Sequence, residues 1–251
     1  MNNCSTLDPA APLTTNASIQ LRMLPLPDYM ANQAEIQWSM RAVLMDWLVQ
    51  VHFRFNLLPE TIFLCVNCVD RFLSYKVVSL GKLQLVGATA LLIAAKYEEI
   101  NPPSVQEIVY MVDGGYSVDE ILKAERFMLT ILGFDLGWPG PMSFLRRISK
   151  ADDYEIDLRT LAKYFLEVTM MDERFVSTPA SYSAAAAHCL AIQMIGKKDA
   201  EKDAEEDAKK DGEKDDKEDG KKDDEKDGEK ERKKDWVWVS FFDSNLIFIL
   251  S

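Results

Sequence analysis

The spacing of apolar residues predicts a helical chain from residue 39 onward. In residues 40–55, MRAVLMDWLVQVHFRF, apolar side chains recur at i, i+3, i+4 and i+7, which is typical of one face of an α-helix, and Ser39 stands where an N-cap is expected. Pro59 and Glu60 open a second predicted helix that ends near Ser74, because proline and an acidic side chain both favour a first helical turn.

A third predicted helix begins after Ser79 and ends before the Asn-Pro-Pro sequence at 101–103. It is apolar on almost every face and rich in glycine and alanine. Other helices must therefore surround it, and its small residues allow them to approach closely. We expect this helix to lie at the centre of its domain.

Two Ser-x-x-Glu capping boxes predict where the next two helices begin. Ser104 with Glu107 opens the fourth helix, and Ser117 with Glu120 opens the fifth. Gly133 is expected to end the fifth helix, because glycine favours the position just after a helix.

A second, similar series follows. Residues 144–150 predict a short helix and residues 153–171 a longer one. Thr178 and Pro179 precede a third, alanine-rich helix that Gly196 is expected to stop. Five helices followed by three indicate an all-α chain with a weak internal repeat, the second unit being incomplete.

Nearly half of the charged residues are gathered in one segment. The formal net charge is -12, and residues 197–235 hold 14 of the 29 basic and 19 of the 41 acidic side chains. That segment buries no apolar surface and is either a solvated charged helix or disordered. The predicted organisation is a flexible N-terminal arm, a complete unit, a partial unit, a charged low-complexity segment and an apolar segment of unknown role, over residues 1–35, 36–136, 137–196, 197–235 and 236–251.

Composition argues against several classes of partner and site. A negative net charge disfavours nucleic acid, and the apolar segment at 236–250 is too short to span a bilayer. Cys65 and Cys68 lack a second cysteine pair or a nearby histidine, so we interpret them as buried core thiols in a reducing compartment. No catalytic pairing, phosphate loop or metal spacing is present, and we expect no cofactor.

Several ordered motifs resemble the cyclin box. They are MRAVLMDWL at 40–48, DRFL at 70–73, KLQLVG at 82–87 and AAKYEEI at 94–100. LPETIFLCVNCVDRFL and FLRRISKADDY are similar to mitotic B-type cyclins, those of fungi in particular. The resemblance covers about residues 24–196 and implies two tandem cyclin boxes, of which only the first is complete.

The resemblance implies a non-catalytic subunit that binds and activates a cyclin-dependent protein kinase at the G2/M transition. It implies that Lys96 and Glu125 contact the mobile helix of that kinase. Glu125 interrupts an apolar helical stripe, which also favours an interface role. Apolar kinase contacts are implied for Tyr97, Leu129, Phe134 and Leu136. Arg41 and Asp70 match a buried ion pair that joins the first two helices.

The resemblance further implies a docking patch for Arg-x-Leu motifs of substrates and inhibitors. The residues that match it are Met40, Val43, Leu44, Trp47, Gln50 and Gln84. The family often has an acidic residue where Gln50 stands, so the grip on the arginine is expected to be weaker. We expect the protein in nucleus and cytoplasm. Two alternatives stay open: an inactive truncated remnant, and a transcription-type protein with the cyclin fold.

Overall fold

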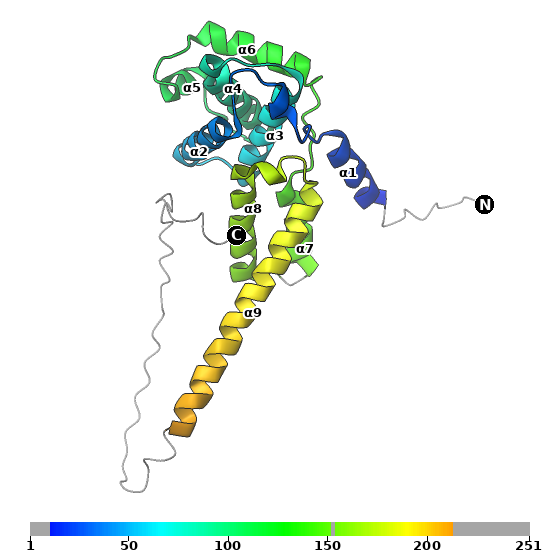
Figure 1. Cartoon of the computed structure of the whole chain (residues 1–251), viewed down its shortest axis with the longest axis vertical. Coiled ribbons are helices and arrows are strands. Elements are labelled where there is room, and N and C mark those ends of the chain that lie inside the picture. Colours follow the sequence, from blue (N-terminus) through cyan, green and yellow to red (C-terminus); the bar gives the residue numbers. More distant parts are fainter. Residues whose placement is uncertain (1–10, 152–153, 213–251) are drawn as a thin grey trace, which may run out of the picture. The chain divides into compact units, whose positions relative to one another are not determined.

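The computed structural model describes residues 11–151 and 154–212, and every regular element in this part of the chain is helical. The chain divides into two units, Met1–Asp203 and Ala204–Ser251. In chain order the elements are α1 (Ala11–Arg22), η1 (Tyr29–Asn32), α2 (Trp38–Arg54), α3 (Pro59–Tyr75), α4 (Leu80–Glu98), α5 (Val105–Met111), α6 (Val118–Ile131), α7 (Pro141–Ala151), α8 (Ile156–Met171), η2 (Glu173–Phe175) and α9 (Ala180–Gly212) (Figure 1). The all-α prediction is confirmed.

Helix α4 is the centre of the first helical domain, as its apolar sequence predicts. It packs against α2, α3, α5 and α6 (Figure 1), and its residues from Val86 to Ala95 are buried without interruption. Gly87 permits the closest approach, because a Cβ at this position would lie 2.7 Å from Leu44 Cδ1 of α2.

The predicted capping boxes are present at both positions. The hydroxyls of Ser104 and Ser117 accept hydrogen bonds from the backbone N–H groups of Glu107 and Glu120, whose carboxylates accept bonds from the serine N–H groups in return. These caps start α5 and α6. Helix α2 begins two residues earlier than predicted, because Gln37 and not Ser39 is at the N-cap position, and no side chain caps it.

The prediction of a flexible N-terminal arm is wrong for residues 16–35. Met23, Tyr29 and Ile36 are at most 3% exposed, and the segment joins the core. Asn67 of α3 donates from Nδ2 to the Met23 carbonyl at 3.0 Å. The prolines of this segment suggested an irregular chain, but its buried apolar side chains provide the free energy that orders it. Residues 1–10 lie outside the described part.

Helix α9 carries a buried alanine stripe, formed by Ala180, Ala184, Ala187 and Ala191. Its first turn is joined to α1 by a reciprocal pair of hydrogen bonds: Gln20 Nε2 donates to Ser181 Oγ at 2.9 Å, and the Ser181 N–H donates to Gln20 Oε1 at 3.0 Å. Gln20 is buried, so α1 acts as a side-chain cap for α9.

The prediction that Gly196 stops this helix is wrong. Helix α9 continues through it to Gly212, and Gly196 does not take the left-handed conformation that ends helices. The residues after it are mostly alanine, lysine, glutamate and aspartate, of which the first three are among the best helix formers. Residues 197–212 are therefore helical, while the rest of the charged segment and the apolar segment at 236–251 lie outside the described residues.

Candidate functional site

Lys96 and Glu125 form an ion pair between the last turn of α4 and the middle of α6. Lys96 Nζ lies 2.6 Å from Glu125 Oε1. The two side chains differ in exposure, since that of Lys96 is 44% exposed and that of Glu125 only 12%. Glu125 stands on the buried stripe between Ile121 and Met128, so its neighbours on α6 hold it at the edge of the core. The pair therefore presents a cation at the surface over a nearly buried carboxylate.

Large apolar side chains on the same two elements are exposed. Tyr97, the residue after Lys96, is 53% exposed, and Phe134, just beyond α6, is 69% exposed. Phe134 follows Gly133, and both have positive φ values, which turns the chain outward after the helix. Leu129 and Leu136 are half-buried and pack against the core.

Ile100 is the most exposed of several apolar residues that the sequence prediction did not single out. Ile100, after the end of α4, is 95% exposed. Its isolated position before Asn-Pro-Pro carries no helical periodicity, so no face could be assigned to it.

The structure separates the predicted docking-patch residues into two kinds. Val43 is 71% exposed, Gln50 and Gln84 are exposed, and Met40 and Trp47 are half-buried. Leu44 is only 5% exposed, so it offers little surface to a ligand, and its place in the patch stays a prediction. Its side chain fills the space above a glycine of α4 and is part of the core. The accessible surface of the patch on α2 and the start of α4 thus comes from the other five residues.

Gln50 is held by an acidic neighbour. Its Nε2 donates to Asp46 Oδ2 at 2.8 Å, one helical turn earlier in α2. This bond uses one of the two N–H donors of the Gln50 amide. The sequence prediction of a weaker grip on an arginine did not include this carboxylate at the edge of the patch.

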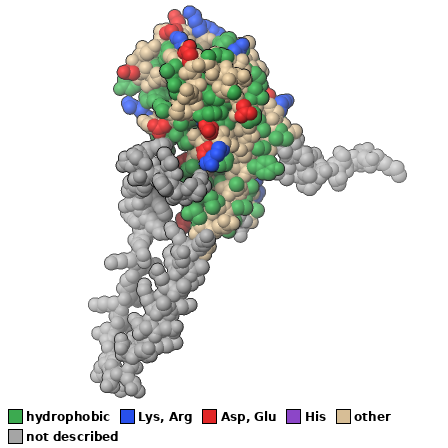
Figure 2. Space-filling view, viewed as in Figure 1, with side chains coloured by type: hydrophobic (Ala, Val, Ile, Leu, Met, Phe, Trp, Pro, Cys, Tyr) green, Lys and Arg blue, Asp and Glu red, His purple; other side chains and the backbone are tan. Residues whose placement is uncertain are grey.

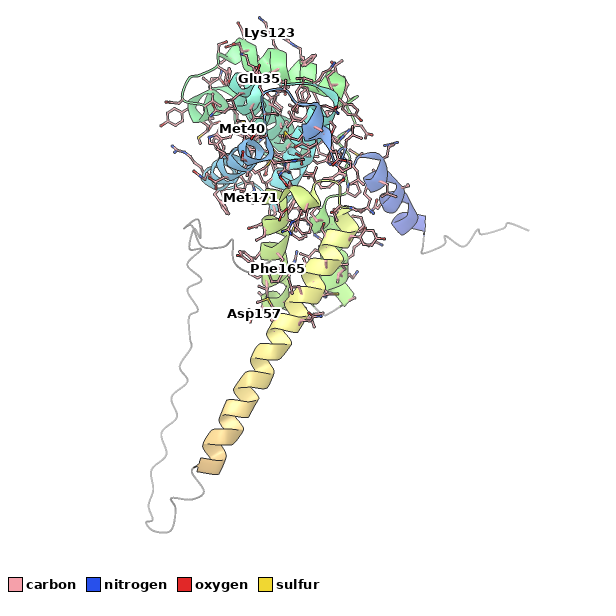
Figure 3. The ribbon with its side chains drawn as sticks, in the orientation of Figure 1. Glu35, Met40, Lys123, Asp157, Phe165 and Met171 are labelled. Atoms are coloured by element: carbon pink, nitrogen blue, oxygen red, sulfur yellow. The ribbon has the colours of Figure 1, made fainter. Side chains whose placement is uncertain are left out.

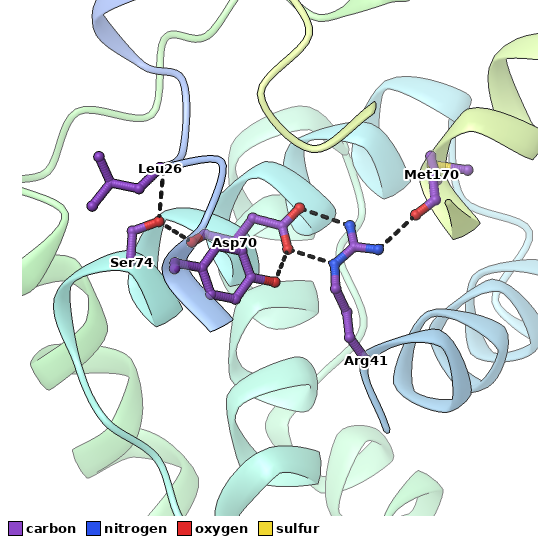
Figure 4. Close-up of polar contacts among 6 residues, drawn as sticks. Leu26, Arg41, Asp70, Ser74 and Met170 are labelled. Carbon is purple, nitrogen blue, oxygen red and sulfur yellow. Dashed lines mark hydrogen bonds and ion pairs between the residues drawn. The ribbon is translucent and has the colours of Figure 1, made fainter. Parts of the chain in front are cut away.

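Arg41 and Asp70 pair through two hydrogen bonds in the core, at 2.7 and 2.8 Å (Figure 4). Tyr29 donates from its hydroxyl to Asp70 Oδ1 at 2.8 Å, and Arg41 Nη1 donates to the Met170 carbonyl at 3.1 Å. The network joins η1, α2, α3 and the end of α8. Figure 3 shows α8 with Asp157 near its start and Met171 at its last residue, the end that meets α2.

Burial and charge shift the pKa values in this network. Burial and the neighbouring Asp70 carboxylate raise the pKa of Tyr29 far above its usual range. Burial alone would lower the pKa of Arg41, but Asp70 outweighs it and the net shift is upward. Both groups therefore keep one protonation state across the physiological range, and the network is structural.

Three other buried titratable groups, the thiols of Cys65 and Cys68 and the imidazole of His52, also have shifted pKa values. Cys65 and Cys68 are buried, and burial raises the pKa of Cys68 to about 12 and that of Cys65 well above its ordinary value. Burial lowers the pKa of His52, whose Nε2 lies 2.9 Å from the Leu58 carbonyl oxygen. Over residues 11–151 and 154–212, no group of three or more His, Cys, Asp or Glu could hold a metal ion.

The exposed face of the described part mixes hydrophobic side chains with charges of both signs (Figure 2). No helix within it has the length and apolar character needed to cross a membrane. The candidate functional sites are two surfaces. One is the ion pair of Lys96 and Glu125 with the exposed aromatic side chains near it, and the other is the patch on α2.

Family models match both halves of the chain. "Cyclin, N-terminal domain" matches residues 13–137 and "Cyclin, C-terminal domain" matches residues 139–210. The first match begins inside α1, earlier than the predicted boundary at residue 36, and the second extends past Gly196 into the charged part of α9. Residues 197–210, predicted from sequence to belong to the charged low-complexity segment, thus lie inside the matched domain.

Curated relatives are mitotic cyclins of fungi. The chain is 63% identical over 179 residues to "G2/mitotic-specific cyclin-4" of Candida albicans, covering 71% of this chain and 37% of the relative. It is 58% identical over 182 residues to "G2/mitotic-specific cyclin cig1" of Schizosaccharomyces pombe, covering 72% and 44%. The "G2/mitotic-specific cyclin cdc13" of the same yeast is 55% identical over 179 residues, covering 71% and 37%. The chain thus spans less than half the length of these relatives.

Solved structures share the fold at low sequence identity. A viral cyclin from Herpesvirus saimiri superposes with a TM-score of 0.66 at 20% identity, over 72% of this chain and 81% of that one. A chain of the yeast RNA Pol II CTD kinase CTDK-1 complex gives a TM-score of 0.58 at 12% identity, over 70% and 61%. These likenesses concern the helical architecture.

Proposed function

Because the chain belongs to the cyclin family, we propose that it is a non-catalytic regulatory subunit that binds and allosterically activates a cyclin-dependent protein kinase. Its relatives are G2/mitotic-specific cyclins, which supports a regulatory role in the cell cycle at the transition from G2 to mitosis. All phosphoryl-transfer chemistry then belongs to the partner, which binds ATP and magnesium.

The observation that carries this proposal is the surface around Lys96 and Glu125. A charge pair half open to solvent lies next to Tyr97 and Phe134, both more than half exposed. Such a combination of a fixed charge and aromatic anchors is typical of a binding surface. The surface lies on the last turn of α4, the middle of α6 and the turn after α6, so two helices hold the charge pair in place.

The mechanism is a shift of the kinase between two states. A kinase is active when the glutamate of its mobile helix pairs with the lysine of the ATP site. A rigid surface that binds the inward position of that helix favours the active state by its difference in affinity for the two states. The residues of this chain therefore act by binding and take no part in the reaction.

A direct affinity measurement tests the proposal. The chain is titrated against a purified mitotic cyclin-dependent kinase, together with Lys96→Ala and Glu125→Ala variants. Both substitutions should weaken binding by about 2–5 kcal/mol if the pair is desolvated in the complex. Lys123→Ala, on the exposed face of α6 (Figure 3), is the matched control and should bind as the unaltered chain does. Unchanged affinity in both test variants would place the kinase surface elsewhere.

The patch on α2 extends the proposal to substrate recruitment. Met40, Val43 and Trp47 provide an apolar face, and Gln50 and Gln84 provide polar groups at its edge. We propose that this face binds Arg-x-Leu motifs of substrates and inhibitors. The proposal includes both nucleus and cytoplasm as the compartments of this chain.

A further inference from the structure

The flank of α6 that faces away from Glu125 carries an exposed aromatic ring beside exposed cations. Phe127 is 52% exposed, and Lys123 and Arg126 are exposed on the same helix. Lys123 is one helical turn from both, so the three side chains are neighbours. Lys123 and Phe127 lie about 160° around α6 from Glu125, and Figure 3 shows Lys123 on the outer edge of this helix. This flank is therefore separate from the ion pair with Lys96.

The end of α3 borders the same ring. The ammonium of Lys76, the residue after α3, lies 5.9 Å from the centroid of the Phe127 ring. Phe72 of α3 meets that ring edge-on, with the two centroids 5.9 Å apart. The two neighbours of Lys76 in the sequence are apolar side chains that are more than half exposed. We call the following six residues the basic-aromatic patch: Tyr75, Lys76, Val77, Lys123, Arg126 and Phe127.

The cations of the basic-aromatic patch have no acidic partner. None of the ion pairs among the described residues includes Lys76, Lys123 or Arg126. Asp119, one turn before Lys123 on α6, forms no ion pair with it either. Glu120 is engaged in its capping box and in an ion pair with the first turn of α4. The patch therefore presents positive charge that no neighbouring carboxylate neutralises.

This charge is opposite in sign to that of the chain as a whole. The formal net charge of the protein is -12. Salt screens exposed charges that lie farther apart than about 8 Å at physiological ionic strength, so the cations of the patch dominate the field close to it. Carboxylates of a partner are the groups that complement them. The exposed face of Phe127 adds apolar surface, which a partner's apolar side chain would remove from water.

The arrangement favours a protein segment over a single phosphate or a nucleic acid. Lys76 lies at the end of one helix, whereas Lys123 and Arg126 lie on successive turns of another. Cations spread in this way suit several carboxylates along a segment better than one compact phosphate group. Affinity for nucleic acid depends on how many phosphates are neutralised, and three cations on an acidic protein provide little of it.

We propose that the basic-aromatic patch binds an acidic segment of a partner protein. Carboxylates of that segment pair with the three cations, and an apolar or aromatic side chain between them packs on Phe127. The patch shares no residue with the surface around Lys96 and Glu125 or with the patch on α2. The inference goes beyond the proposed function, because the binding of this segment requires no kinase.

The test measures peptide binding to the whole chain by fluorescence anisotropy. The probe is a labelled synthetic peptide of aspartates and glutamates around one central phenylalanine. The unaltered chain should bind it, and Lys76→Glu with Lys123→Glu should weaken binding at least about tenfold. The matched control is Arg54→Glu with Lys150→Glu, which makes the same change of net charge at two exposed cations elsewhere. It should bind as the unaltered chain does, and circular dichroism checks that both variants keep their helix content.

A second comparison changes the peptide and leaves the protein unaltered. Replacing the central phenylalanine of the peptide by serine should weaken binding about fivefold, because the contact with Phe127 is lost. The proposal is overturned if the unaltered chain does not bind the probe, if the two double variants lose equal affinity, or if the serine peptide binds as well as the probe. Tighter binding of a single-stranded DNA oligonucleotide than of the probe would also overturn it. No kinase is present, so any of these failures leaves the proposed function intact.

Discussion

Lys96 and Glu125 are joined by one short contact of 2.6 Å, yet the two side chains lie in different surroundings. The lysine is 44% exposed and can be solvated without its partner, whereas the glutamate is only 12% exposed and sits on an apolar stripe of α6. The carboxylate therefore depends on the ammonium more than the ammonium depends on the carboxylate.

This asymmetry predicts unequal effects on the stability of the free protein. Lys96→Ala leaves a nearly buried carboxylate without its cation and should lower the free energy of unfolding by about 1–3 kcal/mol. Glu125→Ala leaves a lysine that reaches water and should cost less than about 1 kcal/mol. Urea unfolding followed by circular dichroism measures both, and equal costs would contradict the asymmetry.

Replacing one residue of the Arg41–Asp70 pair should lower the free energy of unfolding more than replacing both. Arg41→Ala leaves Asp70 buried and unpaired, at a cost of about 3–5 kcal/mol. Replacing both residues by apolar ones of similar size, Arg41→Met with Asp70→Leu, should cost much less, because no charge is left buried. Chemical denaturation of the unaltered chain, of the single variants Arg41→Ala, Arg41→Met and Asp70→Leu, and of the double variant tests this. A double variant as unstable as the sum of its single changes would show that the two charges do not act as a pair.

Val43 and Leu44 provide a matched test of the docking patch. Val43→Ala shortens a side chain that is 71% exposed, so stability should be almost unchanged while binding of Arg-x-Leu peptides weakens. Leu44→Ala opens a cavity above Gly87 and should cost about 2–5 kcal/mol of stability. Calorimetry with a peptide and a parallel unfolding curve separate the two effects. Full peptide affinity in the Val43 variant would remove the patch from the proposal.

The two neighbours Val43 and Leu44 also show where sequence reasoning ends. Helical periodicity predicted α2 and its apolar face, and the glycine- and alanine-rich sequence predicted that α4 is central. The pattern could not tell which of two adjacent apolar residues points inward. That choice depends on the space above Gly87, which exists only once α2 and α4 are packed together.

Long-range contacts account for the other differences between the sequence predictions and the structure. Proline spacing suggested a flexible arm, but Tyr29 bonds to Asp70, 41 residues later, and Gln20 bonds to Ser181, 161 residues later. The Ser-x-x-Glu caps, by contrast, depend on residues three positions apart, and both predictions of this kind are confirmed. The basic-aromatic patch is formed by the end of α3 together with α6, so no single motif could have revealed it.

The two capping boxes predict a pH dependence of stability. Bonds from the backbone N–H and hydroxyl of Ser104 lower the pKa of Glu107, and those of Ser117 lower the pKa of Glu120, relative to 4.5. A carboxyl whose pKa is lower in the folded state stabilises the fold above its unfolded pKa, and this contribution is lost as the pH falls through the folded value.

Glu107→Gln with Glu120→Gln should therefore be less stable at neutral pH and lose stability less steeply below pH 4.5 than the unaltered chain. Unfolding curves collected across the acidic range measure the slope. Asp119→Asn, in the same first turn of α6, is the control. An acid slope identical in the double variant and the unaltered chain would mean that these carboxyls contribute nothing to the pH dependence.

Gly196 tests whether α9 is one continuous helix. A Cβ at this position meets no atom within 4 Å, and the backbone does not adopt a positive φ, so alanine fits without strain. Gly196→Ala should therefore stabilise the helix by about 0.5–1 kcal/mol and raise the helical circular dichroism signal. Gly196→Pro lacks the backbone N–H and clashes with the preceding turn, so it should remove the helical signal of residues 197–212. If α9 instead ended at Gly196 with a left-handed glycine, alanine would destabilise the chain and proline would leave its helix content unchanged.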